Sequence, residues 1–473
     1  MFRKIFYSLF LFSVTFAEKG VHSHSAHLSA EDFSLYWLIP FIGILLSIAV
    51  MPLINASFWH HHYGKVSAFW GLLFLTLFSI YFTDYTLFYI LEVYLREFIP
   101  FIMLLLALFT VSGGILITGN LNGSPKLNTS LLLIGTSLAS IMGTTGASML
   151  LIRPLIRANA WRKNKVHLIV FFIFLVSNIG GSLTPIGDPP LFLGFLKGVD
   201  FTWTLIYMYK PMLFVSAFIF IIFYFVDTYF YKKERELAPK SAELSVKIEG
   251  KINFILILIV IVAVVVSGLE SFQGAILSYH GTTMMTLGTF IQLIILLLVT
   301  IISLKITPDK IRKGNAFTWE PIKEVAKLFA TIFITMIPAI EMLKGVTKQI
   351  GPMSWMKEII IDENGSNIDT MYFWLTGILS SFLDNAPTYV VFFTAALGEH
   401  NVDWLMNTGN TLLAISCGAV FMGAMTYIGN APNFMVKSIS EENKIKMPSF
   451  FGYMGWSILI LFPIFILTSL IFF

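Results

Sequence analysis

Two carboxylates lie inside apolar stretches of the chain that small and polar residues interrupt. Asp188 stands in Thr184-Pro-Ile-Gly-Asp-Pro-Pro, and Asp384 stands in Ser381-Phe-Leu-Asp-Asn-Ala-Pro. A buried charge in a bilayer costs about 2.5–3.5 kcal/mol on insertion scales, so it usually serves a function. Burial favours a protonated carboxylate, whereas neighbouring oxygens favour a bound cation. The two acids therefore predict a site where a small cation and a proton compete. The alternative for each acid is a hydrogen-bonded cap on a short helix, which leaves lone pairs free for an ion.

The interruptions occur in two matched pairs. Thr184-Pro-Ile-Gly-Asp-Pro-Pro-Leu-Phe aligns with Thr426-Tyr-Ile-Gly-Asn-Ala-Pro-Asn-Phe, 242 residues later, and five of nine positions are identical. A second pair, Thr144-Thr145 with Asp384-Asn385, aligns at an offset of 240. Pro and Gly break helices, and irregular backbone survives at membrane depth only where protein or water lines it. We therefore expect a duplicated chain whose four breaks converge near the membrane centre, where broken helix ends hold ions.

The composition is that of a membrane protein. Of the 473 residues, 56% are hydrophobic and 12% are charged, against about 25% charged in soluble domains. The net charge of +4 comes without a basic patch interleaved with aromatics, so no nucleic acid is expected. The single cysteine, Cys417, excludes an internal disulfide and is expected to be a small buried hydrophobe. The sequence has no nucleophile–base pair, hydrolase motif or nucleotide-phosphate loop. We expect a gradient-driven protein that is not an enzyme and needs no cofactor beyond Na⁺ and H⁺.

Ten segments are apolar enough to span a bilayer, which takes about 20 residues of helix. Segments 130–158 and 370–398 are also apolar but break in the middle, so each is expected to fold as a re-entrant hairpin. The ten expected spans lie near 35–54, 66–83, 98–118, 166–186, 204–226, 252–270, 286–304, 320–343, 410–430 and 450–472.

The distribution of Lys and Arg orients these segments. With the mature N-terminus outside, the basic loops fall inside, while outer loops 271–285 and 399–409 contain no Lys or Arg. The hairpins then enter from opposite faces, as an inverted repeat requires. We predict an all-α polytopic protein of a bacterial-type inner membrane, surrounded by lipid, with a hairpin and a broken helix in each inverted half. The expected divisions are a signal peptide (or uncleaved anchor) at 1–17, a periplasmic linker at 18–34, a first repeat at 35–226, a cytoplasmic linker at 227–252 and a second repeat at 253–473.

The broken motifs resemble those of a known superfamily. Ser177-Asn-Ile-Gly-Gly through Asp188, together with Ser381-Phe-Leu-Asp-Asn-Ala-Pro, resembles the ion transporter superfamily, and the resemblance covers roughly 35–472. The similar branch contains NhaD-type sodium/proton antiporters, ArsB-type arsenite-efflux carriers and citrate-transporter-like proteins. The resemblance implies two scaffold regions, two transport regions and an elevator-like displacement. Proteins of this kind often form homodimers.

The same resemblance suggests a set of ligands. It implies that Asp188 and Asp384 match acidic residues of the antiporters, and that Asn178 and Asn385 match polar ones. The leading hypothesis is sodium (or lithium)/proton antiport, with the two acids as Na⁺ ligands. The first hairpin lacks an acid where such antiporters tend to have one, so a citrate-like carboxylate or an arsenite-type oxyanion is the alternative cargo. The predicted ion- or substrate-binding residues are Thr144, Thr145, Ser148, Asn178, Thr184, Asp188, Asp384, Asn385, Thr388, Thr426 and Asn430.

The other polar candidates have a structural interpretation. Arg153 is expected to extend to the cytoplasmic face, the alternative being a contact with Asp188 or with an anionic substrate. The remaining groups are expected at the surface: Glu341 at the end of a span, Glu92, Arg96 and Glu97 as surface pairs, and His60-His61-His62 in a loop, with metal binding as its alternative.

Overall fold

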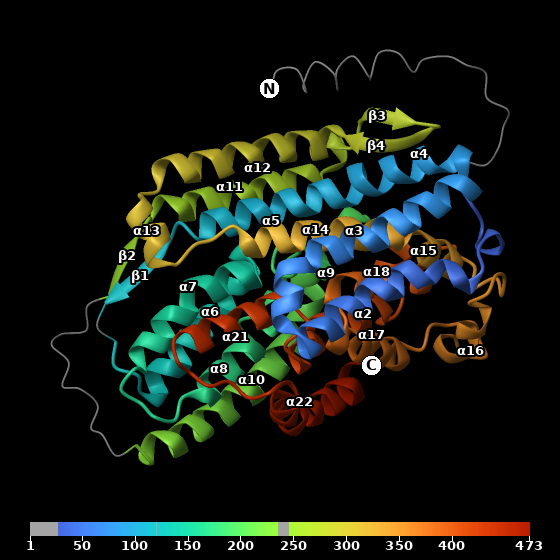
Figure 1. Cartoon of the computed structure of the whole chain (residues 1–473). Coiled ribbons are helices and arrows are strands. Elements are labelled where there is room, and N and C mark those ends of the chain that lie inside the picture. The colour runs from blue at the N-terminus through green and yellow to red at the C-terminus, as the bar shows by residue number, and fades with distance from the viewer. Residues whose placement is uncertain (1–26, 120, 235–245) are drawn as a thin grey trace.

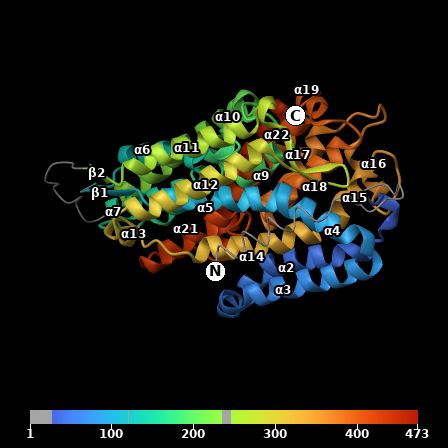
Figure 2. The same ribbon diagram turned by 90° about the horizontal axis from the view of Figure 1, so that it is seen from above.

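The computed structural model describes residues 27–119, 121–234 and 246–473 (Figure 1). The predicted signal peptide at 1–17 lies outside these residues, as do parts of the two predicted linkers. Most of the described chain is helical, and the long helices run side by side in one elongated bundle (Figures 1 and 2).

Seven helices in the described residues are long and apolar enough to cross a membrane, and a bent pair makes an eighth. The bent pair is α14 (Glu320–Thr335) with α15 (Ile337–Lys344), at 41°, and Pro338 at the start of α15 accounts for the break. Two more predicted spans are shorter apolar helices, Ile252–Ser267 and Thr411–Met425. The prediction of an all-α polytopic membrane protein is confirmed. The seven helices are Leu35–Ile54, Ser57–Tyr81, Thr83–Ser112, Val166–Leu183, Trp203–Lys232, Leu287–Ile306 and Phe450–Phe472.

At one side of the bundle, α2 (Ile39–Ile54) and α3 (Ala56–Tyr81) pack together and against α14 (Figure 2). Asn55 separates α2 from α3, and its side chain accepts a hydrogen bond from the Phe58 amide, which caps the start of α3. The helix thus begins early enough to include the histidine run.

The prediction of a loop at His60-His61-His62 is wrong, because these residues lie within α3. Nδ1 of His61 is 2.7 Å from the Ser57 carbonyl oxygen, and Nδ1 of His62 is 3.1 Å from that of Phe58. The imidazoles therefore bond to carbonyls of the preceding helical turn, which a helix tolerates at an exposed position.

The next span is continuous but irregular. It consists of α4 (Thr83–Glu92), a π-helical segment η3 (Val93–Phe98) and α5 (Ile99–Ser112). Its second half packs against α11 (Ile252–Ser267) and α12 (Leu287–Ile306). Wider turns of this kind occur often at functional sites, and η3 provides Glu97, discussed below.

The other elements complete the bundle and connect its parts. The helix α10 (Trp203–Lys232) continues beyond the predicted end of its span at 226, and α22 (Phe450–Phe472) packs against it. The strand β1 (Leu116–Gly119) pairs antiparallel with β2 (Val246–Glu249), so it joins the end of α5 to the start of α11. The remaining short elements are η1 (Ala30–Asp32), η2 (Leu35–Leu38), η5 (Glu270–Phe272), the hairpin of β3 (Ala275–Tyr279) and β4 (Thr282–Thr286), α13 (Asp309–Gly314), η6 (Ser354–Met356), α16 (Lys357–Ile360) and α19 (Val402–Asn407).

Two helical hairpins and two interrupted helices occupy the predicted positions. In the first hairpin the chain reverses at Gly143, whose φ of +80° suits a residue without a Cβ. In the second it reverses at Leu383-Asp384. The first hairpin consists of α6 (Pro125–Met142) and α7 (Thr144–Ala158), and the second of α17 (Asp369–Phe382) and α18 (Asn385–Leu397). The first broken helix consists of α8 (Val166–Leu175), η4 (Ile179–Leu183) and α9 (Pro189–Leu196), and the second of α20 (Thr411–Met422), η7 (Gly423–Met425) and α21 (Ala431–Glu442).

The first broken helix lies at the centre of the bundle. The segment Val166–Leu183 is 89% buried, whereas the other six spans are between 28% and 50% buried. Every residue of α8 after Val166 is buried, so protein rather than lipid surrounds it. Irregular backbone next to such a helix can find protein partners, as a membrane interior demands.

Candidate ion-binding site

The residue at the start of α9 is Asp188, and the local sequence explains why a helix begins there. Pro189 and Pro190 occupy the first positions of α9, where a missing amide proton leaves no hydrogen bond unmade. The Asp188 side chain makes no capping bond to α9. The interpretation of Asp188 as a helix cap is therefore wrong, and its carboxylate is free to bond elsewhere.

The Asp188 carboxylate is 1% exposed and accepts hydrogen bonds from three different elements. Oδ1 accepts from Thr144 Oγ1 of the first hairpin and from Asn430 Nδ2 of the second broken helix, both at 2.9 Å. Oδ2 accepts from Asn385 Nδ2 of the second hairpin at 2.6 Å. All three donors are neutral, and no ion pair to Asp188 occurs among the described residues. The four predicted breaks thus meet at one buried negative charge.

The second acid, Asp384, is partly exposed beside this cluster. Its Oδ1 accepts a hydrogen bond of 3.1 Å from the Ala386 amide, which confirms the expected cap at the start of α18. Thr388 donates to the Asp384 backbone carbonyl at 3.0 Å, which leaves the lone pairs of its hydroxyl oxygen available. The carboxylate keeps lone pairs available on its exposed side.

Asn385 joins the two acids. Its amide nitrogen donates to Asp188, and its own position follows Asp384 directly. Its Oδ1 is buried and has no hydrogen-bond partner among the described residues. A buried carbonyl oxygen without a partner is rare and indicates a place for a ligand. A cation bound there would meet this oxygen next to two carboxylates.

A chain of asparagine amides crosses between the halves. Asn430 Nδ2 lies 3.2 Å from Asn178 Oδ1, and Asn178 Nδ2 donates to Asn433 Oδ1 at 2.7 Å. Asn433 in turn donates to the carbonyls of Gly423 and Thr426. Sequence reasoning found Asn178 and Asn430 but missed Asn433. The alignment of the two motifs could have pointed to Asn433, because it is polar where the aligned residue, Leu191, is apolar.

The predicted threonines of the broken helices hold the hairpins in place. Thr184 Oγ1 donates to the Ser140 carbonyl of the first hairpin. Thr426 Oγ1 donates to the Ser381 carbonyl of the second hairpin at 2.5 Å. These contacts match at offsets of 242 and 241 residues. Ser148 bonds to Ser177 at 2.9 Å, while Thr145 is partly exposed and lies outside these contacts.

Two glycines in each broken helix allow the backbone to fold tightly at the break. A Cβ added to Gly187, next to Asp188, would lie 2.2 Å from the Gly181 carbonyl oxygen. A Cβ added to Gly429 would lie 2.6 Å from the Gly423 carbonyl oxygen. Real Cβ atoms do not approach so closely, so only glycine fits at both places.

Gly187→Ala is therefore expected to destabilise the protein by about 1–3 kcal/mol, the usual range for overpacking. Thermal melting of the purified protein in detergent measures this. Gly455→Ala is the matched control, because Gly455 lies in the α22 helix with no atom within 4 Å of an added Cβ. The control should melt at or above the wild-type temperature. Equal melting of Gly187→Ala and wild type would contradict the tight packing at the break.

The other polar candidates do not reach the site. Arg153 is partly buried, its Nη1 has no hydrogen-bond partner among the described residues, and it makes no contact with Asp188. Glu341 is buried and pairs with Lys344 at 2.8 Å, so the expectation of a surface position is wrong. Cys417 is buried, as predicted.

The expected surface pairing is only partly confirmed. Glu92 pairs with Arg96 at 3.0 Å, but Glu97 of the π-helical segment pairs with Lys197 at the end of α9 at 2.7 Å. A partner 100 residues away could not be read from helical spacing. This ion pair connects the first broken helix to the span that contains η3.

The described residues contain no group of three or more His, Cys, Asp or Glu side chains arranged for a metal ion. The site is instead a set of hydroxyl, amide and carboxylate groups at a break in the membrane helices. A family model described as "Putative citrate transport" matches residues 30–473. The chain belongs to this family. No curated protein matches it. A match over nearly the whole chain, together with the membrane-spanning helices, makes this member of the citrate transport family a polytopic membrane transporter.

Proposed function

We propose that this citrate transport family member exchanges a small monovalent cation, sodium or lithium, for protons. The observation that carries the proposal is the Asp188 cluster, in which a buried carboxylate is bonded only by neutral donors. Next to it, Asn385 Oδ1 is unpartnered and Asp384 retains free lone pairs. Such oxygens suit a cation, and each carboxylate can accept a proton when the cation leaves.

The hydrogen bonds suggest how the exchange operates. Thr144, Asn385 and Asn430 fix the orientation of the Asp188 carboxylate, so the cation meets oxygens that are already in place. Asp384 at the hairpin tip is the more exposed acid and is suited to receive the cation or proton first. Binding of one species lowers the affinity for the other, which is the minimal requirement for exchange.

The matched contacts of the two halves support a duplicated, inverted architecture. The hairpin bonds of Thr184 and Thr426 occur at nearly the same offset as the close glycine pairs. In inverted-repeat transporters one repeat moves against the other around a central site, so that the site opens to each face in turn. The position of Asp188 between four breaks fits this arrangement.

A citrate-like carboxylate is the second candidate, favoured by the family match. Like charges about 4 Å apart repel by about 4 kcal/mol at an effective dielectric constant of 20. No Lys or Arg pairs with Asp188 or Asp384 among the described residues to offset this repulsion. A carboxylate cargo would therefore enter with a co-bound cation or at the amide ends of the broken helices.

Proteoliposomes that contain a pH-sensitive dye test the proposal. Sodium or lithium added outside should raise the internal pH, because cations enter as protons leave, while potassium and citrate should have no effect. Liposomes without protein control for leakage. Flux that depends on citrate, without a response to sodium alone, would refute cation/proton exchange and assign the acids to a co-transported ion.

A further inference from the structure

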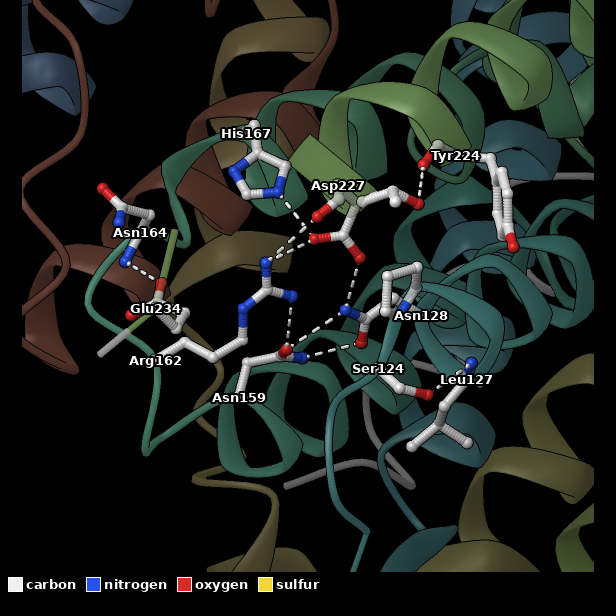
Figure 3. Close-up of polar contacts among 12 residues, drawn as sticks. Ser124, Leu127, Asn128, Asn159, Arg162, Asn164, His167, Tyr224, Asp227 and Glu234 are labelled. Carbon is white, nitrogen blue, oxygen red and sulfur yellow. Dashed lines mark hydrogen bonds and ion pairs between the residues drawn. The ribbon is translucent and has the colours of Figure 1, made fainter. Parts of the chain in front are cut away.

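A second buried polar cluster lies at the base of the first hairpin, where α6 begins and α7 ends, and Figure 3 shows its contacts. Its centre is Asp227 of α10, whose side chain is fully buried. Asp227 Oδ1 contacts Arg162 Nη2 at 2.6 Å and His167 Nε2 at 2.8 Å, and Oδ2 accepts from Asn128 Nδ2 at 2.8 Å. We call Asn128, Asn159, Arg162, His167 and Asp227 the Asp227 cluster.

The cluster joins four elements of the first half. Asn128 is on α6, and Asn159 follows α7; the two amides bond to each other in both directions, at 3.1 and 2.8 Å. Arg162, between α7 and α8, donates to Asn159 Oδ1 at 3.2 Å. His167 is in the first turn of α8. The base of the hairpin, the start of the broken helix and the end of α10 are therefore bonded through one carboxylate.

A further acid holds the connecting loop. Glu234, directly after α10, accepts hydrogen bonds from the backbone amides of Lys163 and Asn164, at 3.0 and 2.8 Å. Partial burial opposes ionisation of Glu234, but these hydrogen bonds outweigh it, so its pKa lies below the ordinary value. Glu234 therefore stays charged near neutral pH and keeps the loop that carries Arg162 beside α10.

Stability alone does not account for the cluster. Burying an ion pair usually gains little over packing apolar residues of similar volume, because both charges lose their hydration. Such pairs are better explained by a specific arrangement that they enforce. Here the arrangement fixes the base of α6–α7 against α8, and these elements lead to Thr144 and Asp188.

His167 gives the cluster a titratable member. A carboxylate only accepts, so Nε2 of His167 must donate its proton to Asp227. The ring stacks on Phe230 of α10, with centroids 4.6 Å apart. The ionisable groups that act on His167 are Asp227, Arg162 and, from the segment after α10, Glu234, while α6 contributes the neutral Asn128. A second ring proton would place two cations, Arg162 and His167, on one buried carboxylate.

We propose that the Asp227 cluster is a latch that holds the first hairpin against the first broken helix, and that protonation of His167 loosens it. The positive-inside pattern puts this end of the hairpin on the cytoplasmic face, so the latch responds to cytoplasmic pH. Its effect on transport rests on the function proposed above, whereas its effect on the hairpin does not.

Hydrogen–deuterium exchange of the full-length protein in nanodiscs tests the latch without any transport. After correction for intrinsic exchange rates, wild-type amides in 125–158 should exchange faster at about pH 5 than at about pH 8, the range over which histidine changes charge. His167→Gln keeps a neutral donor at every pH, so it should remove most of this difference. His400→Gln is the control, because His400 is exposed and stacks on Trp404 outside the cluster. An unchanged pH difference in His167→Gln would overturn the proposal.

Asp227→Asn provides an independent test. It removes the charge that opposes Arg162, so exchange in 125–158 should rise at both pH values. If this variant does not accumulate, Asn159→Ala, which loses the bonds to Asn128 and Arg162, serves the same purpose. Exchange equal to wild type in a folded variant would show that the cluster does not hold the hairpin.

The dye assay adds the functional readout. His167→Gln should retain more sodium-driven flux than wild type at about pH 5 and equal flux at about pH 8. If wild type shows no sodium response at any pH, cation/proton exchange fails while the hydrogen-exchange result still decides the latch. Equal pH profiles of His167→Gln and wild type would overturn the regulatory role.

Discussion

Asp188→Asn is expected to reduce sodium-driven proton flux by about 100-fold or more, within the 2–5 kcal/mol that removal of one member of a buried charged contact costs. The substitution removes the only fully buried carboxylate among the described residues of the site. The new amide also places one nitrogen against Asn385 Nδ2 or Asn430 Nδ2, both of which donate to the native carboxylate. Two donors that face each other cannot bond, so the oriented set of oxygens is lost as well.

The dye assay in proteoliposomes measures this loss, with the amount of reconstituted protein matched by gel. Asp200→Asn is the control, because Asp200 is exposed in the loop that follows α9 and makes no ion pair among the described residues. The control should transport as wild type does. Flux through Asp188→Asn at the wild-type rate would exclude Asp188 from the exchange mechanism.

Asp384→Asn is expected to separate the two roles of the second acid. Asn is as good a helix cap as Asp, so the bond to the Ala386 amide is preserved and the free energy of unfolding should change by less than about 0.5 kcal/mol. The charge is lost, so flux should fall by about 10-fold or more, the equivalent of about 1.4 kcal/mol. Thermal melting and the dye assay on the same preparations measure the two effects.

Two further variants give the comparison. Asp384→Ala loses both cap and charge, so it should transport as poorly as Asp384→Asn. It should also melt at a lower temperature, because loss of the cap lowers the free energy of unfolding by about 1 kcal/mol. Asp403→Asn removes an exposed acid in the first turn of α19, another helix start, and should leave flux unchanged. Full activity in Asp384→Asn would reduce the role of Asp384 to capping.

The sequence predicted the breaks well because their causes are local. Gly143 turns the first hairpin and Pro189 and Pro190 begin α9, and the apolar segments around them are long enough to recognise. The same local reasoning identified Asp188 and Asn430 through the repeat. It placed His60–His62 in a loop, because polarity suggested an end of the helix where the side chains in fact bond to helix carbonyls.

Contacts between distant segments could not be predicted in this way. The hydrogen bonds from Thr184 and Thr426 to hairpin carbonyls could not be read from the segments that contain these threonines. Asp227 lay at the border of a predicted linker, and its partners come from α6, α8 and the loop before α8. Lys197 finds Glu97 only because the broken helix returns to the span that contains η3. Each of these pairings depends on how helices pack, which no pattern within one segment records.

The hydrogen bond between Asp188 and Asn430 has a consequence for the gene duplication that the proposed inverted repeat implies. In the proposed inverted repeat these residues occupy equivalent positions, 242 residues apart, and they touch. Equivalent residues meet only where a two-fold axis passes between them. In an ancestor made of two identical halves, the same residue would have met its own copy there, giving two repelling carboxylates or two neutral amides. Divergence after duplication would have left a single negative charge on the axis, an outcome that a symmetric pair of identical subunits cannot reach.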